Sequence, residues 1–501
     1  MNLPHSGSFI LKSDERIQTY KDNPTYTGNP DALCFARDFH DVAEILKECN
    51  ERKLPVTFCG SRTSLTGSSS ADSGLVVALE KKDRFLDVWK DPKTGEVLAR
   101  AEPGVLLGDF KARVAEAGLR RAGAAPAAQA GYFYPPDPTS YKEAQLGGTV
   151  ATNATGEDTF LYGPTRQYVR ELKILTATGE ERILKRSRMP VISSKNRAGY
   201  FLEGEAIDEM IGSEGTLGLI TEVTCAVLPH SRGHFSLLIP FNDFLASIEF
   251  VVKTVQSSLK PRAVELIGPG AFEIFAKHPD APRFPEGTKS VIYLKQEYQS
   301  DGSDKPPGGK SDRSDEWLQW VEAFYRERGH PDWSESIFFG ESEKQKDDIR
   351  TWRHHIPATV NEEARRFHEE GGGKISTDWW VPIHQLLPMM EWVYAESLRL
   401  LALKIPFLVF AHIGNGHPHW NFLTKNSAEK RTIHDFVLEQ CRRAVKSGGG
   451  VAGEHGLGKI HRDYLPIQHS RETIARMVAL KKKWDPNWIL GRGNILPLPT
   501  P

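Results

Sequence analysis

The sequence lacks the features that would place it in several large protein classes. No apolar run approaches the ~20 residues that a membrane-spanning helix needs. The N-terminal stretch has neither the basic region nor the apolar core of a secretory signal. Lysine plus arginine (64) nearly equals aspartate plus glutamate (65), so no overall positive charge would attract nucleic acid. We therefore expect a cytoplasmic protein, either free or peripheral to the membrane.

Cysteine is scarce and scattered. The five cysteines include no C-x-x-C pair and lie far apart along the chain, at Cys34, Cys49, Cys59, Cys225 and Cys441. This spacing argues against a disulfide framework or a zinc ribbon, and it is typical of a reducing compartment.

A dinucleotide-binding Rossmann fingerprint is also missing. The glycine-rich stretch "CGSRTSLTGSSS" (59–70) leads into the apolar strand pattern "GLVVALE" (74–80), whereas a Rossmann glycine turn opens a helix. Clustered backbone N–H groups and hydroxyls in such a loop can still bind phosphate. The alternative interpretation is a flexible surface loop.

Two further small-residue loops favour ligand binding. Residues 134–156 read "YPPDPTSYKEAQLGGTVATNATG", and residues 210–223 read "MIGSEGTLGLITEV". Small side chains allow a large flat molecule to approach the backbone closely. Three such loops in one strand-rich region predict a single extended ligand between them.

The pattern of elements predicts an α+β protein of two or three domains. Val42, Ile45, Leu46 and Cys49 have the spacing of a buried helical stripe. Short strands dominate up to about residue 230. From about 231 to 345 a strand–helix–strand pattern occurs twice, and alternating helices and strands continue to residue 423.

Histidine and glutamate cluster in two glycine-rich stretches of the second half. In "VFAHIGNGHPHWNF" (409–422), a glycine-rich turn separates His412 from His419, so the chain can reverse and bring both imidazoles to one point. In "AGEHGLGK" (452–459), Glu454 and His455 stand between glycines. Two histidines and a carboxylate would suit a catalytic zinc. The alternative for the second stretch is a helix end followed by a turn, which leaves the Glu-His pair unexplained.

These motifs resemble those of the FAD-linked D-2-hydroxy-acid dehydrogenases of the vanillyl-alcohol-oxidase superfamily, from about residue 25 to the C-terminus. That family includes D-lactate dehydrogenase, the glycolate oxidase catalytic subunit and D-2-hydroxyglutarate dehydrogenase. The matching stretches are "PVTFCGSRTSLTG", "PDPTS", "GGTVATNATG", "GSEGTLG", the pattern H-x-G-x-G-x-x-H-x-N and "EHG". The resemblance implies a two-subdomain FAD-binding domain over 1–230 and an α+β substrate (cap) domain with an antiparallel sheet over 231–425. A C-terminal helical segment, 426–501, would complete the active site and pack on the FAD domain.

The resemblance also implies which residues bind FAD. They are Gly60, Ser61, Thr63, Ser64 and Gly67 in the first loop, Pro136, Asp137, Thr139, Ser140, Gly148, Ala151, Thr152 and Asn153 in the second, and Ile220 after the third. No histidine lies in 56–69, so we expect the flavin to be bound non-covalently.

By the same resemblance, His412, His419 and Glu454 bind a divalent metal, zinc or manganese, while His455 acts as the base. Asn421 would contact the substrate. The stretch "DDIRTWRHHIP" resembles the family's W-x-x-R-E-x-I-P helix, which implies that Arg353 anchors the substrate carboxylate. The expected reaction is oxidation of a D-2-hydroxy acid to the 2-oxo acid, with hydride transfer to flavin N5.

The sequence departs from the family pattern at several positions. Asn415 stands where aspartate is usual, and His417 stands where asparagine is usual, so His417 is a competing metal ligand. Relatives that oxidise a dicarboxylate carry a lysine two residues before Asp378, where this chain has Ser376; Lys374 lies two residues away. We therefore expect a monocarboxylate such as D-lactate.

Several alternatives stay open. D-2-hydroxyglutarate or glycolate could be the substrate. The protein could also be a non-redox flavoenzyme like the ether-lipid synthases, although these carry a histidine triplet where this chain has only Glu454 and His455. A non-enzymatic flavin or metal-binding subunit is a third reading. The electron acceptor of a dehydrogenase would be a quinone, a cytochrome or an electron-transfer flavoprotein, and a homodimer is compatible with the resemblance.

Overall fold

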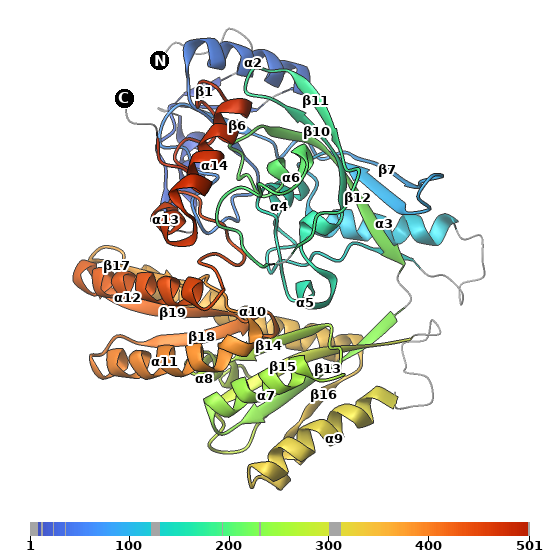
Figure 1. Ribbon diagram of the computed structural model, residues 1–501, viewed down its shortest axis with the longest axis vertical. Helices are drawn as coiled ribbons and strands as arrows, with labels where there is room; N and C mark the ends of the chain where they lie inside the picture. Colours follow the sequence, from blue (N-terminus) through green and yellow to red (C-terminus); the bar gives the residue numbers. More distant parts are fainter. Residues whose placement is uncertain are drawn as a thin grey trace.

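The computed structural model describes residues 9–11, 14–23, 25–35, 37–121, 131–192, 194–229, 232–299 and 312–498. These residues form two lobes (Figure 1). The upper lobe contains the first half of the chain together with α13 (Leu465–Gln468) and α14 (Arg471–Trp484). The lower lobe contains the elements from β13 to α12. The expected boundary at residues 230 and 231 falls outside the described residues.

The first sheet of the upper lobe has the strand order β1-β4-β6-β5. Its strands are β1 (Phe9–Leu11), β4 (Ala32–Phe35), β5 (Val56–Cys59) and β6 (Leu75–Ala78). Helix α2 (Phe39–Arg52) begins at the N-cap Asp38, and its stripe of Val42, Ile45, Leu46 and Cys49 is fully buried, as predicted. β5 and β6 are parallel neighbours, so residues 60–74 connect them as a loop without a helix.

The second sheet is antiparallel, in the order β11-β10-β12-β8-β7, with β9 beside the end of β12. Its strands are β7 (Phe85–Lys90), β8 (Val97–Ala101), β9 (Tyr132–Phe133), β10 (Val169–Leu175), β11 (Glu181–Lys185) and β12 (Leu219–Pro229). The helices of this region are α3 (Leu107–Arg121), α4 (Leu146–Ala151), α5 (Thr159–Tyr162) and α6 (Ala206–Met210). Two antiparallel hairpins, β7–β8 and β10–β11, belong to this sheet.

The lower lobe is built on one antiparallel sheet of order β16-β13-β15-β14-β18-β19-β17. Its strands are β13 (Arg232–Phe241), β14 (Ala263–Ile267), β15 (Ser290–Gln299), β16 (Phe338–Gly340), β17 (Gly371–Ser376), β18 (Phe407–His412) and β19 (His417–Asn426). The mixed α+β architecture with an antiparallel sheet in this lobe confirms the expected fold class.

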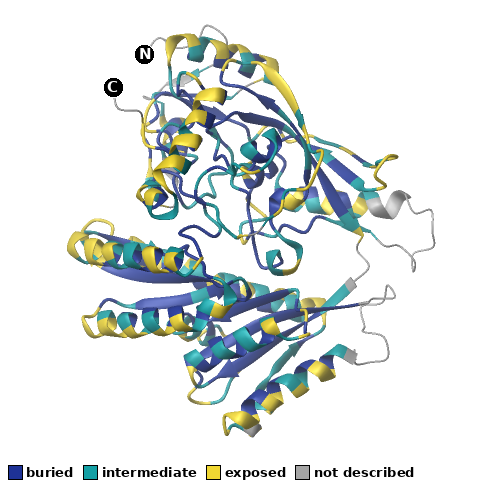
Figure 2. Cartoon of the chain, in the orientation of Figure 1, coloured by how far each residue is buried: buried dark blue, intermediate teal, exposed yellow. Residues whose placement is uncertain are grey.

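Helices cover both faces of this sheet. Because side chains alternate along a strand, Leu237 and Leu238 enter different apolar clusters. Leu237 shares its cluster with residues of α7 (Phe244–Gln256), α9 (Asp312–Glu327), α11 (Ile383–Ala402) and α12 (Ser427–Lys446). Leu238 packs with α8 (Ala271–Ala276) and α10 (Glu343–Arg365). Figure 2 shows the strands buried and the outer helix faces exposed.

The C-terminal residues divide between the lobes. Helix α12 packs on β17 and β19 of the lower sheet. Beyond it, α14 contacts the upper lobe, where Lys481 Nζ donates to the carbonyl of Thr216. Leu490 then pairs with Val56 of β5 in a parallel bridge. The segment after α12 therefore carries the chain from the lower lobe back to the glycine-rich loops.

The lengths of the helices and the state of the cysteines bear on two further expectations. None of the helices in the described ranges is long and apolar enough to cross a bilayer. All five cysteines are buried and free.

Candidate active site

The three histidines of the stretch 409–422 lie on the two strands of a tight hairpin. His412 ends β18, and His417 opposite it begins β19, which places His419 opposite Phe410. The connection is one 3-10 turn followed by Gly416 at φ +64°. A Cβ at Gly416 would lie 2.0 Å from the carbonyl oxygen of Val381, so the turn requires glycine.

Glu454 joins both histidines. Its Oε2 lies 3.2 Å from His412 Nε2 and 3.5 Å from His419 Nε2. The three ligand atoms lie within 4.8 Å of one another, and two imidazoles with one carboxylate are a donor set that zinc prefers. The three residues predicted as metal ligands are thus brought together.

Outer partners fix the orientation of both rings. His412 Nδ1 lies 2.8 Å from Glu265 Oε1, and His419 Nδ1 lies 3.1 Å from the carbonyl oxygen of Thr377. When Nδ1 donates to such a partner, Nε2 presents its lone pair. In that tautomer, two lone pairs and the carboxylate of Glu454 face one point, so the three residues could hold a cation between them.

The charges of this cluster are strongly coupled. Although burial opposes the charge, Glu265 and Glu454 raise the pKa of His412 to about 9. Burial would raise the pKa of Glu454, but His412 and His419 hold it well below its usual range. The cluster therefore stabilises positive charge at its centre and keeps its carboxylate ionised.

His455, the predicted base, is held by Asp378. Its Nδ1 lies 3.0 Å from Asp378 Oδ1, and Asp378 Oδ2 accepts the backbone N–H groups of Glu454 and His455. Burial lowers the pKa of His455, but Asp378 outweighs this effect and raises it above its usual value. With Nδ1 turned to Asp378, His455 Nε2 is left to exchange a proton, and the imidazolium is stabilised by the carboxylate.

His417, the expected competitor for the metal, binds Asp378 as well. Its Nε2 lies 3.0 Å from Asp378 Oδ1, and its buried Nδ1 has no hydrogen-bond partner in the described part of the chain. Asp378, His417 and His419 form a second group whose ligand atoms lie close enough for a metal. His419 belongs to both groups, so it cannot bind a metal in both of them at the same time.

Arg353 and Asn421 lie beside the cluster but are already hydrogen-bonded. Arg353 Nη1 donates to Glu157 at 2.5 Å, and its Nη2 donates to Glu265. Asn421 is fully buried, donates to the carbonyl of His419 at 3.0 Å and accepts from Ser376 Oγ at 2.5 Å. Arg353 keeps further N–H donors, whereas the amide of Asn421 is used at both ends.

The three predicted flavin loops contact one another. Gly212 N donates to the carbonyl of Val150, and Glu214 N donates to that of Ala151, so the third loop is bonded to the second. The first loop contacts the second at Gly60, where a Cβ would lie 2.4 Å from Gln145 Oε1. The predicted small-residue run of the second loop forms the short helix α4 over Leu146–Ala151.

The individual residues predicted to bind FAD lie on these loops. Between β5 and β6 lie Gly60, Ser61, Thr63, Ser64 and Gly67. The residues that precede α4 are Pro136, Asp137, Thr139 and Ser140, and those within or just after it are Gly148, Ala151, Thr152 and Asn153. The last residue, Ile220, lies on β12. Asp137 has a partner of its own, because Lys111 Nζ lies 2.5 Å from its Oδ1.

The loops have the properties that a flavin nucleotide needs. Gly148 is exposed and has no atom within 4 Å of the position of a Cβ, so a flat ring can approach the backbone there. The buried hydroxyls of Ser69 and Thr155 have no hydrogen-bond partner among the residues described. These open backbone positions and spare hydroxyls fit FAD.

The C-terminal glycine loop joins the flavin loops to the His/Glu cluster. Glu214 of the third loop accepts the N–H groups of Leu457 and Gly458 at 2.9 and 2.7 Å. The carbonyl of Thr66 in the first loop accepts from Lys459 N at 2.9 Å. The predicted base and metal ligand therefore lie directly beside the predicted flavin site.

A cavity of about 490 Å³ opens beside His455. Its lining includes Ser376 and Asp378, Thr66 of the first loop, and Lys430 and Arg431 of α12. The cavity provides room for a small substrate next to the base.

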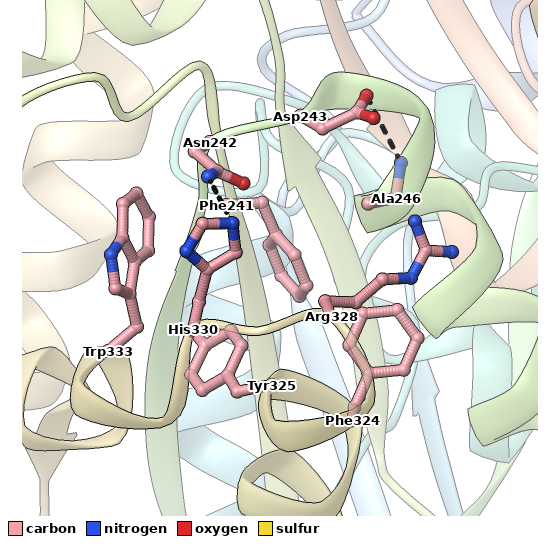
Figure 3. Close-up of a pocket in the computed structure, with 9 residues that line it drawn as sticks. All are labelled: Phe241, Asn242, Asp243, Ala246, Phe324, Tyr325, Arg328, His330 and Trp333. Atoms are coloured by element: carbon pink, nitrogen blue, oxygen red, sulfur yellow. Dashed lines mark hydrogen bonds between the residues drawn. The ribbon is translucent and has the colours of Figure 1, made fainter.

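A second hollow of about 330 Å³ lies at the end of β13, between α7 and α9 (Figure 3). Its polar groups bind one another: Asn242 Nδ2 lies 2.8 Å from His330 Nε2, and Asp243 caps α7. None of the predicted site residues lines it, so it is not the active site.

Glu265 and Glu157 were not predicted from the sequence. Glu265 contacts both His412 and Arg353 and is 1% exposed, and Glu157 contacts Arg353 and Lys295. A single carboxylate in the apolar strand "AVELIG" is a usable signal, because a buried charge needs a partner. Glu157 in the turn "GED" gave no such signal.

Comparisons with known proteins identify the family of the chain. A family model for an FAD binding domain matches residues 30–185, and a model for the C-terminal domain of FAD linked oxidases matches residues 234–495. A D-lactate dehydrogenase of Anaerostipes hadrus is 30% identical over 93% of this chain and 89% of that protein. The glycolate oxidase subunit GlcD of Bacillus subtilis is 25% identical, covering 96% and 92%.

A D-2-hydroxyglutarate dehydrogenase of Stutzerimonas stutzeri is also 25% identical, over 97% of this chain and 96% of that protein. Among solved structures, an alkyldihydroxyacetonephosphate synthase superposes with a TM-score of 0.62 at 16% identity, over 93% of this chain and 77% of that one. This likeness shows the fold. The chain belongs to the FAD-linked hydroxy-acid dehydrogenase family of the vanillyl-alcohol-oxidase superfamily.

Proposed function

We propose that this protein oxidises a D-2-hydroxy acid, with D-lactate favoured, to the 2-oxo acid. The observation that supports the proposal best is the pair His455–Asp378 beside the group His412, His419 and Glu454, at the junction with the flavin loops. A base backed by a carboxylate next to a cation-binding group is what removal of a hydroxyl proton requires. We also retain the division into domains 1–230, 231–425 and 426–501.

The residues of the chain would divide the work as follows. His455 Nε2 accepts the hydroxyl proton, and Asp378 stabilises the charge that forms. Arg353 lines the carboxylate end of the site through its remaining N–H groups. When bound, FAD would supply a two-electron acceptor and a zinc or manganese ion would supply Lewis acidity at the substrate hydroxyl. His412, His419 and Glu454 would hold that ion.

Substrate preference follows from the wall of the cavity. Ser376 Oγ donates to Asn421, and Lys374 Nζ donates to Asn361 Oδ1 at 2.6 Å, so the segment in which dicarboxylate-oxidising relatives carry a lysine offers no free cation to a second carboxylate. The other cations in the lining of the cavity are Lys430 and Arg431 of α12. A distal carboxylate without a partner loses about 1.5–3 kcal/mol, or roughly 10- to 150-fold in affinity. D-2-hydroxyglutarate and glycolate remain the other candidates within the family.

The test is anaerobic flavin reduction against D- and L-2-hydroxy acids, with metal analysis of the same preparation. We expect D-lactate to bleach the flavin with a higher kcat/KM than D-2-hydroxyglutarate. A flavin that no 2-hydroxy acid reduces would support the non-redox alternative. A higher kcat/KM for hydroxyglutarate that is lost in Lys374→Ala would show that Lys374 leaves Asn361 and serves the substrate.

Reduced flavin must then pass its electrons to a quinone, a cytochrome or an electron-transfer flavoprotein, and a homodimer is our expected assembly. Dye-coupled activity of the purified chain would exclude a purely accessory role.

A further inference from the structure

Lys195 lies in the connection between β11 and α6, where the flavin loops meet the His/Glu cluster. Its neighbour Arg197 donates its backbone N–H to the carbonyl of Ala452 at 2.8 Å, two residues before Glu454. The side-chain Nε of Arg197 donates to the carbonyl of Asn153 in the second flavin loop at 3.3 Å. The segment is therefore bonded on one side to the proposed metal loop and on the other to a flavin loop.

The ammonium group of Lys195 is buried and unshared. Its Nζ is excluded from solvent and has no hydrogen-bond partner within the described ranges. The carboxylates whose charge acts on it most are Glu454, Glu265 and Asp378, yet no carboxylate oxygen of the described residues lies within 4.0 Å of it. Burial lowers the pKa of Lys195 to about 8 against the charge of Glu454, so the amine stays mainly protonated at pH 7.

Three other cations near the cluster are already in use. Arg353 is paired with Glu157 and Glu265. Lys374 donates to Asn361, and Arg197 donates to backbone carbonyls. A buried ammonium without a partner is costly, so the unshared N–H donors of Lys195 are suited to an anion that enters the site.

We propose that Lys195 binds the carboxylate of the substrate and thereby directs the 2-hydroxyl group towards His455 and the His412–His419–Glu454 cluster. This assignment rests on the proposed function. It gives the carboxylate a point-charge partner on the upper lobe, whereas Arg353 on the lower lobe is already paired with Glu157 and Glu265. The ammonium would thus favour a negatively charged substrate over a neutral one, and the substrate would bridge the two lobes.

The experiment uses the FAD-loaded protein and a ligand that cannot react. 2-Hydroxy-2-methylpropanoate has the hydroxyl and the carboxylate but no C2 hydrogen, and its amide lacks only the charge. Binding of both is followed by the flavin absorption spectrum in wild type, Lys195→Met, Lys195→Arg and Lys253→Met. Lys253 is an exposed lysine of α7 that pairs with Glu249 and Glu327, and it controls for the loss of one positive charge.

Lys195→Met should bind the acid about 10- to 100-fold more weakly than the wild type, because one charge-assisted hydrogen bond is lost. Binding of the amide should change less than about twofold, and Lys195→Arg should restore much of the preference for the acid. Lys253→Met should bind both ligands like wild type. An unchanged affinity of Lys195→Met for the acid would overturn the assignment.

Two outcomes distinguish substrate binding by Lys195 from flavin binding by Lys195 and from failure of the proposed function. If Lys195→Met binds sulfite at the flavin less tightly but binds the acid normally, Lys195 serves the flavin and the assignment is wrong. If no 2-hydroxy acid reduces the flavin of the wild type, the proposed function is wrong. If the wild-type flavin is reduced but Lys195→Met binds the acid as tightly as the wild type, only the role of Lys195 is wrong. Should Lys195→Met lose FAD, a crystal structure of wild type with the acid decides. A carboxylate oxygen within about 3.2 Å of Lys195 Nζ supports the assignment, and contact with Arg353 alone contradicts it.

Discussion

At the residue scale, two buried carboxylates decide which histidine nitrogen is available for chemistry. Glu265 holds Nδ1 of His412, and Asp378 holds Nδ1 of His455. In both rings Nε2 is left facing the site. The same carboxylates stabilise positive charge on the rings, which suits one ring to bind a cation and the other to take up a proton.

Replacing Asp378 by asparagine should therefore remove catalysis while leaving the flavin in place. The amide cannot stabilise the imidazolium of His455, and general base catalysis is worth about 10²- to 10⁴-fold. We expect kcat to fall by at least about 100-fold with an unchanged flavin-to-protein ratio. Asp243→Asn, which keeps a good N-cap at α7, is the matched control and should retain full activity. A kcat within tenfold of wild type in Asp378→Asn would refute this role.

The sequence allowed most of the central residues to be predicted, because each belongs to a local motif. His412, His419, Glu454 and His455 lie in two short glycine-rich stretches. Lys195 and Glu265 could not be assigned a role in advance, since their partners lie in distant segments. Arg353 was predicted to anchor the substrate carboxylate, and only the fold reveals the two protein carboxylates that bind it.

At the element scale, the hairpin β18–β19 brings together His412 and His419, the two histidines of the proposed metal site. Gly416 adopts a left-handed conformation against the carbonyl of Val381. Elements of this kind were predicted well where periodicity was strong, as for α2. The stretch 134–156 was expected to be a loop, and α4 within it was missed, because Gly147 and Gly148 weaken helix propensity. The first turn of α4 is held by distant residues, since Leu146 N and Gly147 N donate to the carbonyls of Val105 and Pro103.

Gly416→Ala should destabilise the protein and remove the metal. The left-handed conformation alone costs an alanine about 1–2 kcal/mol, and the Cβ would also lie 2.0 Å from Val381 O. We expect a loss of roughly 3 kcal/mol or more in the free energy of unfolding, together with a lower metal content. The measurements are urea unfolding and elemental analysis.

Gly95→Ala is the matched control for this prediction. Gly95 also has a positive φ, +74°, but no atom lies within 4 Å of the position of its Cβ. It should lose only about 1–2 kcal/mol and keep its metal. Equal losses in the two variants would mean that the contact with Val381 is unimportant.

At the scale of the whole molecule, a buried ion network joins the two lobes. Glu157 and Asp158, which follow the second flavin loop, pair with Lys295 of β15, and Arg262 pairs with Asp158. Burial opposes ionisation, but these cations and Arg353 hold the pKa values of Glu157 and Asp158 below their usual range. Acid should therefore weaken the junction between the lobes.

The sign of the pH dependence follows from those pKa values. Carboxyl groups with a depressed folded pKa contribute stability above their unfolded pKa of about 4 and lose it as the pH falls further. We expect the free energy of unfolding to drop between about pH 5 and pH 2. In Lys295→Met it should already be about 3 kcal/mol lower at pH 7, because a buried pair has lost one partner, and the remaining acid-dependent drop should be smaller.

Lys253→Met again provides the comparison, because an exposed pair contributes less than about 1 kcal/mol. A pH profile of Lys295→Met that runs parallel to that of wild type would show that the network does not carry the acid sensitivity.

The return of the C-terminal residues to the first flavin loop has a consequence for how the protein is made. Asn494 Nδ2 donates to the carbonyl of Ser68, 426 positions earlier in the chain, and Leu490 bridges to Val56. At a synthesis rate of about 5–20 residues per second, the emerging glycine loop waits roughly 20 to 90 seconds for these partners. The flavin loops therefore gain these contacts only after residue 494 has been synthesised, and a ribosome that stalls before residue 490 leaves a nascent chain whose flavin loops lack this C-terminal segment.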